Sequence, residues 1–351
     1  MFDCNKLSHV TYYPMMAVLC VRDTFSGGAA IIECLQFACA QLNLHAALFG
    51  PLFPITLSIA TLLGITSALL TWAFDGKYIA EYFGLKDDTS SHPPSKHPWL
   101  QRFCHILAGL YYISVSGMAA IAVLTMLSIS LGSPISLIIV LGWTSIEFCR
   151  YYYEERPSLN ELISGADNNE KACNHDAPPA LIGFFIVACL REALNALSTV
   201  IDFTHFLIQQ LKLNRTTCRW LDPAAILFSL VMSIVGALVF YCFDCNVIAN
   251  TLQYQLPGNS KTKASPKNNE QPLSFTGKVA LLLCYCYYGS SSVLNALAVL
   301  NMAMLGGIVF SPVATLLITL FWVSTDLYRF NGVEQPEVTK SIKTYLQNNS
   351  Q

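Results

Sequence analysis

Charged residues are scarce in this sequence. Asp, Glu, Lys and Arg make up 12% of its 351 residues, whereas about a quarter is typical of a soluble domain, and 54% of the residues are hydrophobic. A water-soluble globular fold is therefore excluded. The apolar runs also lack the polar–apolar alternation of a membrane β-barrel, so the backbone must satisfy its hydrogen bonds within helices. The composition predicts an all-α, polytopic integral membrane bundle.

Signatures of several function classes are also missing. The sequence has no Gly-Lys-Ser/Thr phosphate loop, no Gly-x-Ser-x-Gly elbow and no His-Glu-x-x-His motif, so we expect neither an enzyme nor a cofactor. Basic residues occupy short loops without interleaved aromatics, which argues against nucleic acid as a partner. The N-terminus lacks the pattern of a signal peptide. Two thiols, Cys242 and Cys245, flank Asp244, and Cys104-His105 adds another pair of potential ligands. Structural zinc usually needs two pairs with consistent spacing, so we do not predict a metal site.

One long apolar stretch is present twice. Pro54, a run of 20 residues without a charge, and then Asp75 recur as Pro223, another such run of 20 residues, and Asp244. A run of this length can cross a bilayer, and the charge then appears where the span should end. The repeat continues further along the chain, where Tyr111-Tyr112 matches Tyr287-Tyr288, Ser133-Pro134 matches Ser311-Pro312, and Trp143, Glu147, Arg150 and Glu155 match Trp322, Asp326, Arg329 and Glu334.

This duplication predicts about eight transmembrane helices, arranged as two parallel four-helix repeats. A first apolar segment, Gly28–Phe49, is weakened by polar residues, but we count it as a span. The expected organisation is an N-terminal cytoplasmic or interfacial segment (1–27), a first membrane repeat (28–156), a cytoplasmic linker (157–179), a second membrane repeat (180–333) and a polar tail (334–351).

The distribution of basic residues predicts the orientation. With eight spans, only Lys212, Arg215 and Arg219 lie on the side opposite the N-terminus, and Arg191 lies within a span. With three spans per half, both faces would carry basic loops. Because Lys and Arg concentrate in cytoplasmic loops, the first arrangement is favoured and both termini are predicted to be cytoplasmic.

Acidic residues at the ends of the even-numbered spans form the first candidate site. An Asp at a helix C-terminus opposes the helix dipole and should seek a cation or a partner. The candidates for an ion or substrate site are therefore Asp75, Asp244, Glu147 and Asp326, together with Arg150 and Arg329, each one turn beyond an acid. The alternative is an interfacial belt, in which ion pairs finish the helices beside Trp143 and Trp322.

Polar residues inside the odd-numbered spans form the second candidate site. A charge facing lipid at depth costs about 2.5–3.5 kcal/mol, so such residues should face the bundle interior or a watery cavity. The predicted intramembrane polar path consists of Glu33, His45, Arg191, Glu192, Asn195, Asp202, Tyr112 and Tyr288. Arg191 and Asp202 are a possible pair, whereas the adjacent Arg191 and Glu192 are not expected to share a face. Interhelical packing is the alternative for the hydroxyl residues.

Two functions remain open at this point. Polar residues within apolar spans on a duplicated scaffold favour a carrier or channel for a small solute or cation, which would follow a polar path between two pseudo-symmetric halves. The other hypothesis is a non-transporting membrane scaffold that presents cytoplasmic loops to protein partners. The lipid bilayer is an expected partner under both hypotheses.

Overall fold

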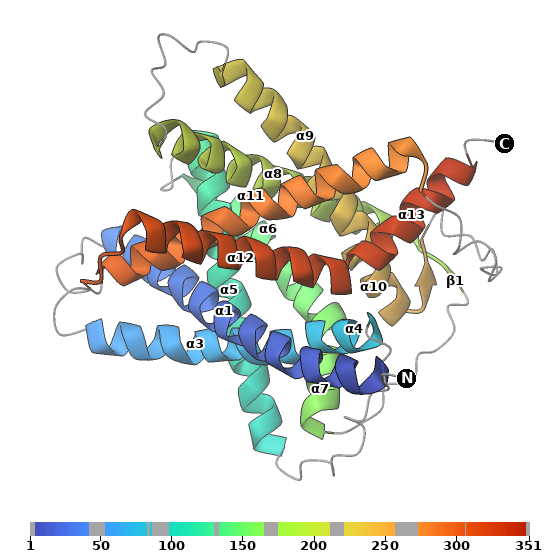
Figure 1. Cartoon of the computed structure of the whole chain (residues 1–351), viewed down its shortest axis with the longest axis horizontal. Coiled ribbons are helices and arrows are strands. Elements are labelled where there is room, and N and C mark those ends of the chain that lie inside the picture. The colour runs from blue at the N-terminus through green and yellow to red at the C-terminus, as the bar shows by residue number, and fades with distance from the viewer. Residues whose placement is uncertain are drawn as a thin grey trace. The chain divides into compact units, whose positions relative to one another are not determined.

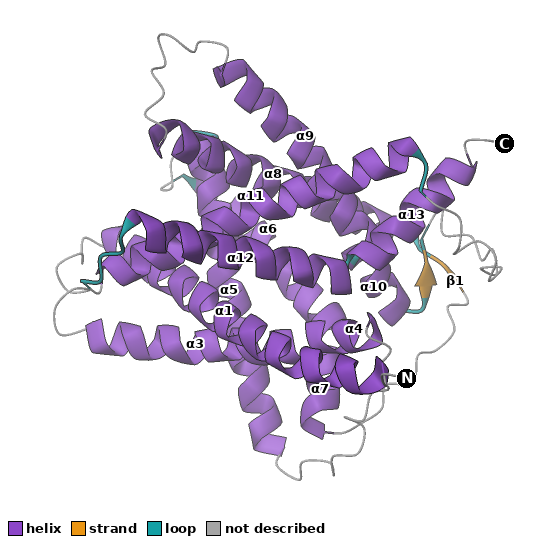
Figure 2. Cartoon of the chain, in the orientation of Figure 1, coloured by secondary structure: helices purple, strands orange, loops and turns teal. Residues whose placement is uncertain are grey.

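The computed structural model describes residues 4–41, 53–82, 85, 98–129, 133–164, 175–210, 221–256, 273–305 and 307–348. Almost all of them are helical, as Figure 2 shows. The elements labelled in Figure 1 or lying between them are α1 (Cys4–Gln41), α3 (Phe53–Ala73), α4 (Asp75–Tyr82), α5 (Pro98–Met126), α6 (Pro134–Arg150), the π-helical turn η2 (Tyr151–Glu155), α7 (Arg156–Ser164), β1 (His175–Asp176), α8 (Pro179–Gln210), α9 (Leu221–Cys242), α10 (Asp244–Thr251), β2 (Tyr254–Gln255), α11 (Phe275–Leu305), α12 (Pro312–Val333) and α13 (Gln335–Asn348).

Seven helical segments in the described part of the chain are long and apolar enough to cross a membrane. They are Thr11–Leu35, Pro54–Glu81, Trp99–Met126, Pro179–Thr204, Pro223–Thr251, Phe275–Leu300 and Pro312–Val333. Many leucine, isoleucine, valine and phenylalanine side chains on these segments are exposed, as expected for helix faces that contact lipid. The all-α class is thereby confirmed, and the chain is a multi-pass membrane protein.

The first of these segments lies earlier than predicted. The apolar part of α1 includes Thr11–Leu35, so it extends toward the N-terminus beyond the predicted Gly28–Phe49, of which residues 42–49 fall outside the described residues. Arg22 and Asp23 had suggested that this stretch was extramembrane, but they form an ion pair with each other, which lowers the cost of burying them. The boundary predicted at residue 27 therefore falls inside α1.

The chain forms two compact units that do not coincide with the predicted halves. Unit 1 comprises residues 1–168 and 292–333, and unit 2 comprises residues 169–291 and 334–351. Helix α12 thus belongs with the N-terminal helices, whereas α13 belongs with α8 and α9. The two units are described separately below.

The interior of unit 1 centres on α1 and α3, which pack along each other. Gly64 of α3 permits their close approach, because a Cβ placed there would lie 2.4 Å from the Thr24 carbonyl oxygen of α1. Small residues of this kind let membrane helices approach closely. The adjoining core consists of Ile31, Ile32, Ala60 and Leu63.

Unit 2 has a comparable centre in the pair α8 and α9. The Ser233 hydroxyl of α9 donates to the Ala193 carbonyl oxygen of α8 over 2.8 Å. Outside the helices, β1 and β2 pair in parallel, with His175 opposite Tyr254 and Asp176 opposite Gln255. Helix α13 packs against α9.

Each unit contains a helix break at the end of an apolar run. Phe74 separates α3 from α4, and Phe243 separates α9 from α10. Asp75 and Asp244 follow the breaks directly, so each lies in the first turn of a new short helix. A carboxylate there complements the helix dipole. This corrects the expectation that the two aspartates oppose a dipole at a helix C-terminus.

Candidate functional site

Unit 1 contains a group of paired charges that we call the ionic cluster, made up of Arg22, Asp23, Asp75, Asp326 and Arg329. Arg22 of α1 reaches the neighbouring Asp23 at 2.6 Å and Asp326 of α12 at 2.5 Å. Arg329, one turn beyond Asp326, donates from Nε and Nη2 to the two Asp75 carboxylate oxygens at 2.7 and 3.0 Å. Ion pairs therefore join three segments that are distant in sequence: α1, the start of α4, and α12.

Side chains around the cluster hold its members in place. The Thr71 hydroxyl donates to Asp23, and Tyr12 donates to the Gly76 carbonyl oxygen at 3.1 Å, just beyond Asp75. On α12 the Trp322 indole donates to Ser26 at 3.0 Å, and the ring is 6% exposed. Trp322 therefore packs against α1, in a core with Ala29, and is not the interfacial aromatic of the belt hypothesis.

The cluster holds an excess of negative charge away from water. Its three carboxylates face two guanidinium groups, and the exposed fraction of these five side chains lies between 5% for Asp75 and 20% for Arg329. Charges removed from water are stable only when paired and hydrogen-bonded, and removal of one partner is strongly destabilising. The surplus carboxylate is chemically suited to a proton or a small cation.

A second group surrounds the π-helical turn that follows α6. Arg150 lies 3.2 Å from Glu147 and 3.0 Å from Glu154, while Glu155 accepts a hydrogen bond from the Tyr112 hydroxyl of α5. The extra residue of a π turn rotates the positions that follow, and here Glu154 and Glu155 are both buried. Burial raises the pKa of Glu155 to about 7, although Arg150 acts in the opposite direction.

His105 lies at the edge of this second group. One ring nitrogen is 2.7 Å from the Tyr151 hydroxyl, and the other is 2.8 Å from the Asn160 side-chain oxygen. These contacts join α5, the π turn and α7 in unit 1. The sequence had offered His105 only beside Cys104, as a second pair of potential metal ligands.

Unit 2 carries its own ion pair inside α8. Arg191 is 3% exposed and donates to the adjacent Glu192 at 2.9 Å. Adjacent positions point to different sides of a helix, but the arginine side chain is long enough for the two groups to pair. Glu192 also accepts from Asn195 at 3.4 Å and from Tyr287 of α11 at 3.5 Å.

The other predicted residues of the polar path are dispersed. Tyr288 donates to Glu334 in unit 2, and Glu33 is half-buried on α1. Asp202 is exposed on α8. Asp244 is buried, and His45 lies outside the described residues. In the described parts of the chain, no three His, Cys, Asp or Glu side chains gather as metal ligands.

Sequence reasoning missed Arg22 and Asp23, although a signal was present. The spacing of 169 residues that relates Pro54 to Pro223 also relates Arg22 to Arg191, and Asp23 to Glu192. The same spacing relates Cys20 to Cys189. Extending the repeat toward the N-terminus would therefore have placed the first span over Arg22.

Comparison of the chain with protein-family models, with curated proteins and with solved structures found no match.

Proposed function

We propose that the chain is a membrane carrier or channel for a small solute or cation, in which the ionic cluster takes up a proton or cation. The observation that carries the proposal is the surplus of one carboxylate in a buried cluster on three apolar helical segments. Ionisable residues at such depth are costly and commonly mark ion pathways or proton relays. No enzymatic reaction is part of this proposal.

The proposal includes eight spans with both termini cytoplasmic. The eighth span would be α6, whose 17 α-helical residues reach the lower end of the length that crosses a bilayer. Moving the first span to Thr11–Leu35 leaves the charge argument intact, because residues 36–53 contain no Lys or Arg. Reporters fused to the C-terminal tail and to the turn near Gly132 should then report opposite compartments.

Corresponding contacts within the two units support a duplicated architecture. Tyr112 binds Glu155 and Tyr288 binds Glu334, in the register that the sequence repeat requires. The ion pair of Arg22 with Asp23 likewise corresponds to that of Arg191 with Glu192. Two sequence-matched sets of contacts favour two related halves.

Uptake by reconstituted vesicles tests the function. Asp75→Asn removes one carboxylate from the cluster and should abolish uptake of the transported ion or solute. Because this substitution leaves Arg329 without its carboxylate, the double variant Asp75→Asn/Arg329→Gln is needed as well, since it removes the pair together. The double variant should regain thermal stability without regaining uptake.

A matched control is available on α13. Glu337→Gln also removes a carboxylate, but this one forms a solvent-exposed pair with Lys340 at 3.2 Å. The control should leave uptake unchanged, since exposed pairs contribute little. Normal uptake by the double variant would exclude the ionic cluster from transport.

A second candidate function is a non-transporting membrane scaffold. The observation that favours it is that each of the five charges in the ionic cluster has an ionic partner, as in a purely structural clasp. Under this hypothesis, vesicles that contain well-folded protein show no uptake of ions or metabolites above protein-free vesicles. The Asp75→Asn variant would then lose stability alone.

A further inference from the structure

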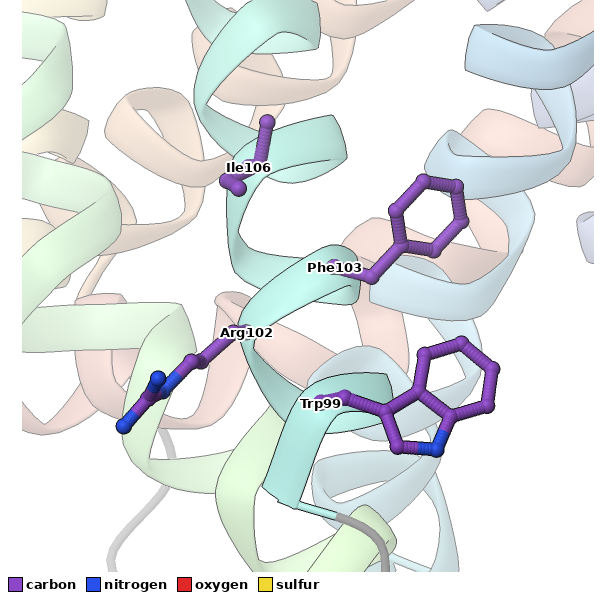
Figure 3. A pocket seen from close by; sticks show the side chains of 4 residues that line it. All are labelled: Trp99, Arg102, Phe103 and Ile106. Carbon is purple, nitrogen blue, oxygen red and sulfur yellow. The ribbon is translucent and has the colours of Figure 1, made fainter.

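The first turns of α5 form an open groove on the surface of unit 1. It has a volume of about 420 Å³ and is lined by Trp99, Arg102, Phe103 and Ile106. Figure 3 shows Trp99 and Phe103 extending to one side of the helix and Arg102 to the other. Residues four positions apart form a ridge along a helix. One ridge consists of Trp99 and Phe103, and the neighbouring ridge consists of Arg102 and Ile106. The groove is the furrow between these ridges.

Three of the four lining residues are large, apolar and exposed. The exposed fraction is 64% for Trp99, 44% for Phe103 and 61% for Ile106. Trp99 is also the first residue of the apolar segment Trp99–Met126, which places it where a span meets the lipid headgroups. An apolar furrow at this depth lies beside the upper part of the lipid acyl chains.

Arg102 adds a cation without a partner among the described residues. Its side chain is exposed and forms no hydrogen bond or ion pair with any residue that the structure describes. A guanidinium group binds phosphate oxygens in a bidentate manner. The furrow thus offers an apolar track for a chain and, at its outer end, an available charge for an anion.

The corresponding turns of α11 in unit 2 repeat this arrangement. At a spacing of 176 residues, Phe275, Lys278, Val279 and Leu282 replace the four residues of α5 in the same order. Phe275 is 83% exposed and likewise opens an apolar segment, Phe275–Leu300. Lys278 is exposed and makes no side-chain hydrogen bond or ion pair among the described residues. An available cation between an aromatic and an aliphatic side chain therefore occurs twice.

We propose that the α5 groove, and its counterpart on α11, each bind one membrane lipid with an anionic phosphate headgroup. The phosphate is bound by Arg102 or Lys278, and an acyl chain lies along the aromatic and aliphatic ridges. The exposed apolar lining favours a lipid over a free phosphate ion, because a free ion would leave the lining uncovered. The inference is independent of any transport activity.

Quenching of Trp99 fluorescence by brominated lipids tests the proposal directly. The full-length protein is reconstituted with brominated phosphatidic acid or brominated phosphatidylcholine, and Trp99→Phe identifies the signal of this residue among the five tryptophans. The anionic lipid should be favoured at Trp99 by about fivefold, the usual effect of one basic residue at an anionic surface. Arg102→Gln should abolish this preference.

Two control variants separate the site from general charge effects. Arg156→Gln removes the same charge from α7, where Arg156 lies 4.3 Å from the Tyr152 ring, and should preserve the preference at Trp99. The variant Trp99→Phe/Phe275→Trp moves the reporter to α11, where the same preference should appear and Lys278→Gln should abolish it.

Three outcomes would overturn the proposal. Equal quenching by both lipids would show that Trp99 is only an interfacial anchor. A preference that survives Arg102→Gln would assign it to other charges. Inorganic phosphate should not compete, because it has no acyl chain, and relief of quenching by phosphate would assign the groove to a free anion.

Discussion

In the α1–α3 pair of unit 1 the helices meet at Gly64, whereas the corresponding residue of the α8–α9 pair is Ser233. A Cβ at Gly64 would lie 2.4 Å from the Thr24 carbonyl oxygen, while Ser233 donates a hydrogen bond to the corresponding Ala193 carbonyl oxygen at 2.8 Å. One pair therefore relies on close backbone approach and the other on a side-chain bond. A single sequence pattern thus tolerates two ways of joining neighbouring membrane helices.

The same two pairs differ again one turn further along. In unit 1, Gly27 lies beside Ser67, whose hydroxyl donates to Tyr111 at 2.9 Å. In unit 2 the larger residue lies on the other helix, because Ala196 of α8 faces Gly236 of α9. The Tyr287 ring is also close to Gly236. Each contact has room for one small side chain but not for two.

The Asp75–Arg329 pair should give the largest effect. Asp75→Asn removes the carboxylate that accepts two hydrogen bonds from the buried Arg329 and should reduce the free energy of unfolding by about 3–5 kcal/mol. Unfolding in detergent, followed by circular dichroism, measures this loss. The double variant Asp75→Asn/Arg329→Gln should recover most of the stability, and a double variant as unstable as Asp75→Asn would contradict the pairing.

Gly64→Ala should destabilise unit 1 by about 1–3 kcal/mol, the usual cost of overpacking. The added methyl group would meet backbone, which cannot rotate away as a flexible side chain can. The control is Gly142→Ala, because a Cβ at Gly142 meets nothing within 4 Å. Equal melting temperatures for the two variants would show that α1 and α3 are not in close contact.

Exchanging the small residues of unit 2 should reveal compensation. Gly236→Ser places a Cβ about 2.8 Å from the Ala196 Cβ and should cost about 1–2 kcal/mol. Adding Ala196→Gly reproduces the arrangement of Gly27 and Ser67, and should restore most of the lost stability. A double-mutant cycle on melting temperature measures the coupling, and strict additivity of the two changes would contradict the proposed contact.

The burial of Glu155 should make stability depend on pH. Because burial raises the pKa of Glu155 to about 7, from an unfolded value near 4.5, the folded state binds more protons between these values. Stability should therefore fall by about 2 kcal/mol as the pH rises from about 5 to about 8. Glu155→Gln should flatten the profile of melting temperature against pH, whereas Glu337→Gln should leave it unchanged.

Ser233→Ala should have the smallest effect, about 1 kcal/mol, since it removes one hydrogen bond between α8 and α9. The same substitution at Ser145 is the control, because the Ser145 hydroxyl donates to a carbonyl oxygen of its own helix. A loss at Ser233 as large as that of Gly64→Ala would mean that the two helix pairs are joined in the same way.

The span after Pro54 could be predicted from sequence because its charges stand at its ends. Pro54 and Asp75 bound an uncharged run, and the apolar segment of the structure begins at that proline, but Arg22 and Asp23 stand in the middle of α1 and hid the first span. Their compatibility with burial depends on Asp326, which lies 304 positions from Arg22 in the chain. Local composition cannot predict such a partner.

Ion pairs were harder to predict than spans for the same reason. The helical spacing correctly predicted that Arg150 pairs with Glu147. The equivalent Arg329, however, forms its ion pair with Asp75. Both arginines are one turn beyond an acid, so their sequence neighbourhoods are alike, and only the packing of α12 against α4 separates them. The candidate roles of these residues in binding stay predictions.

The reversed sizes at Gly27–Ser67 and Ala196–Gly236 constrain how the two halves could have diverged. If both descend from one duplicated gene, one of them exchanged which helix carries the larger side chain. A direct path through two larger residues would bring Cβ atoms to about 2.8 Å and clash. In that case an intermediate with glycine on both helices would avoid the clash, and its contact would be looser than either of the two present ones.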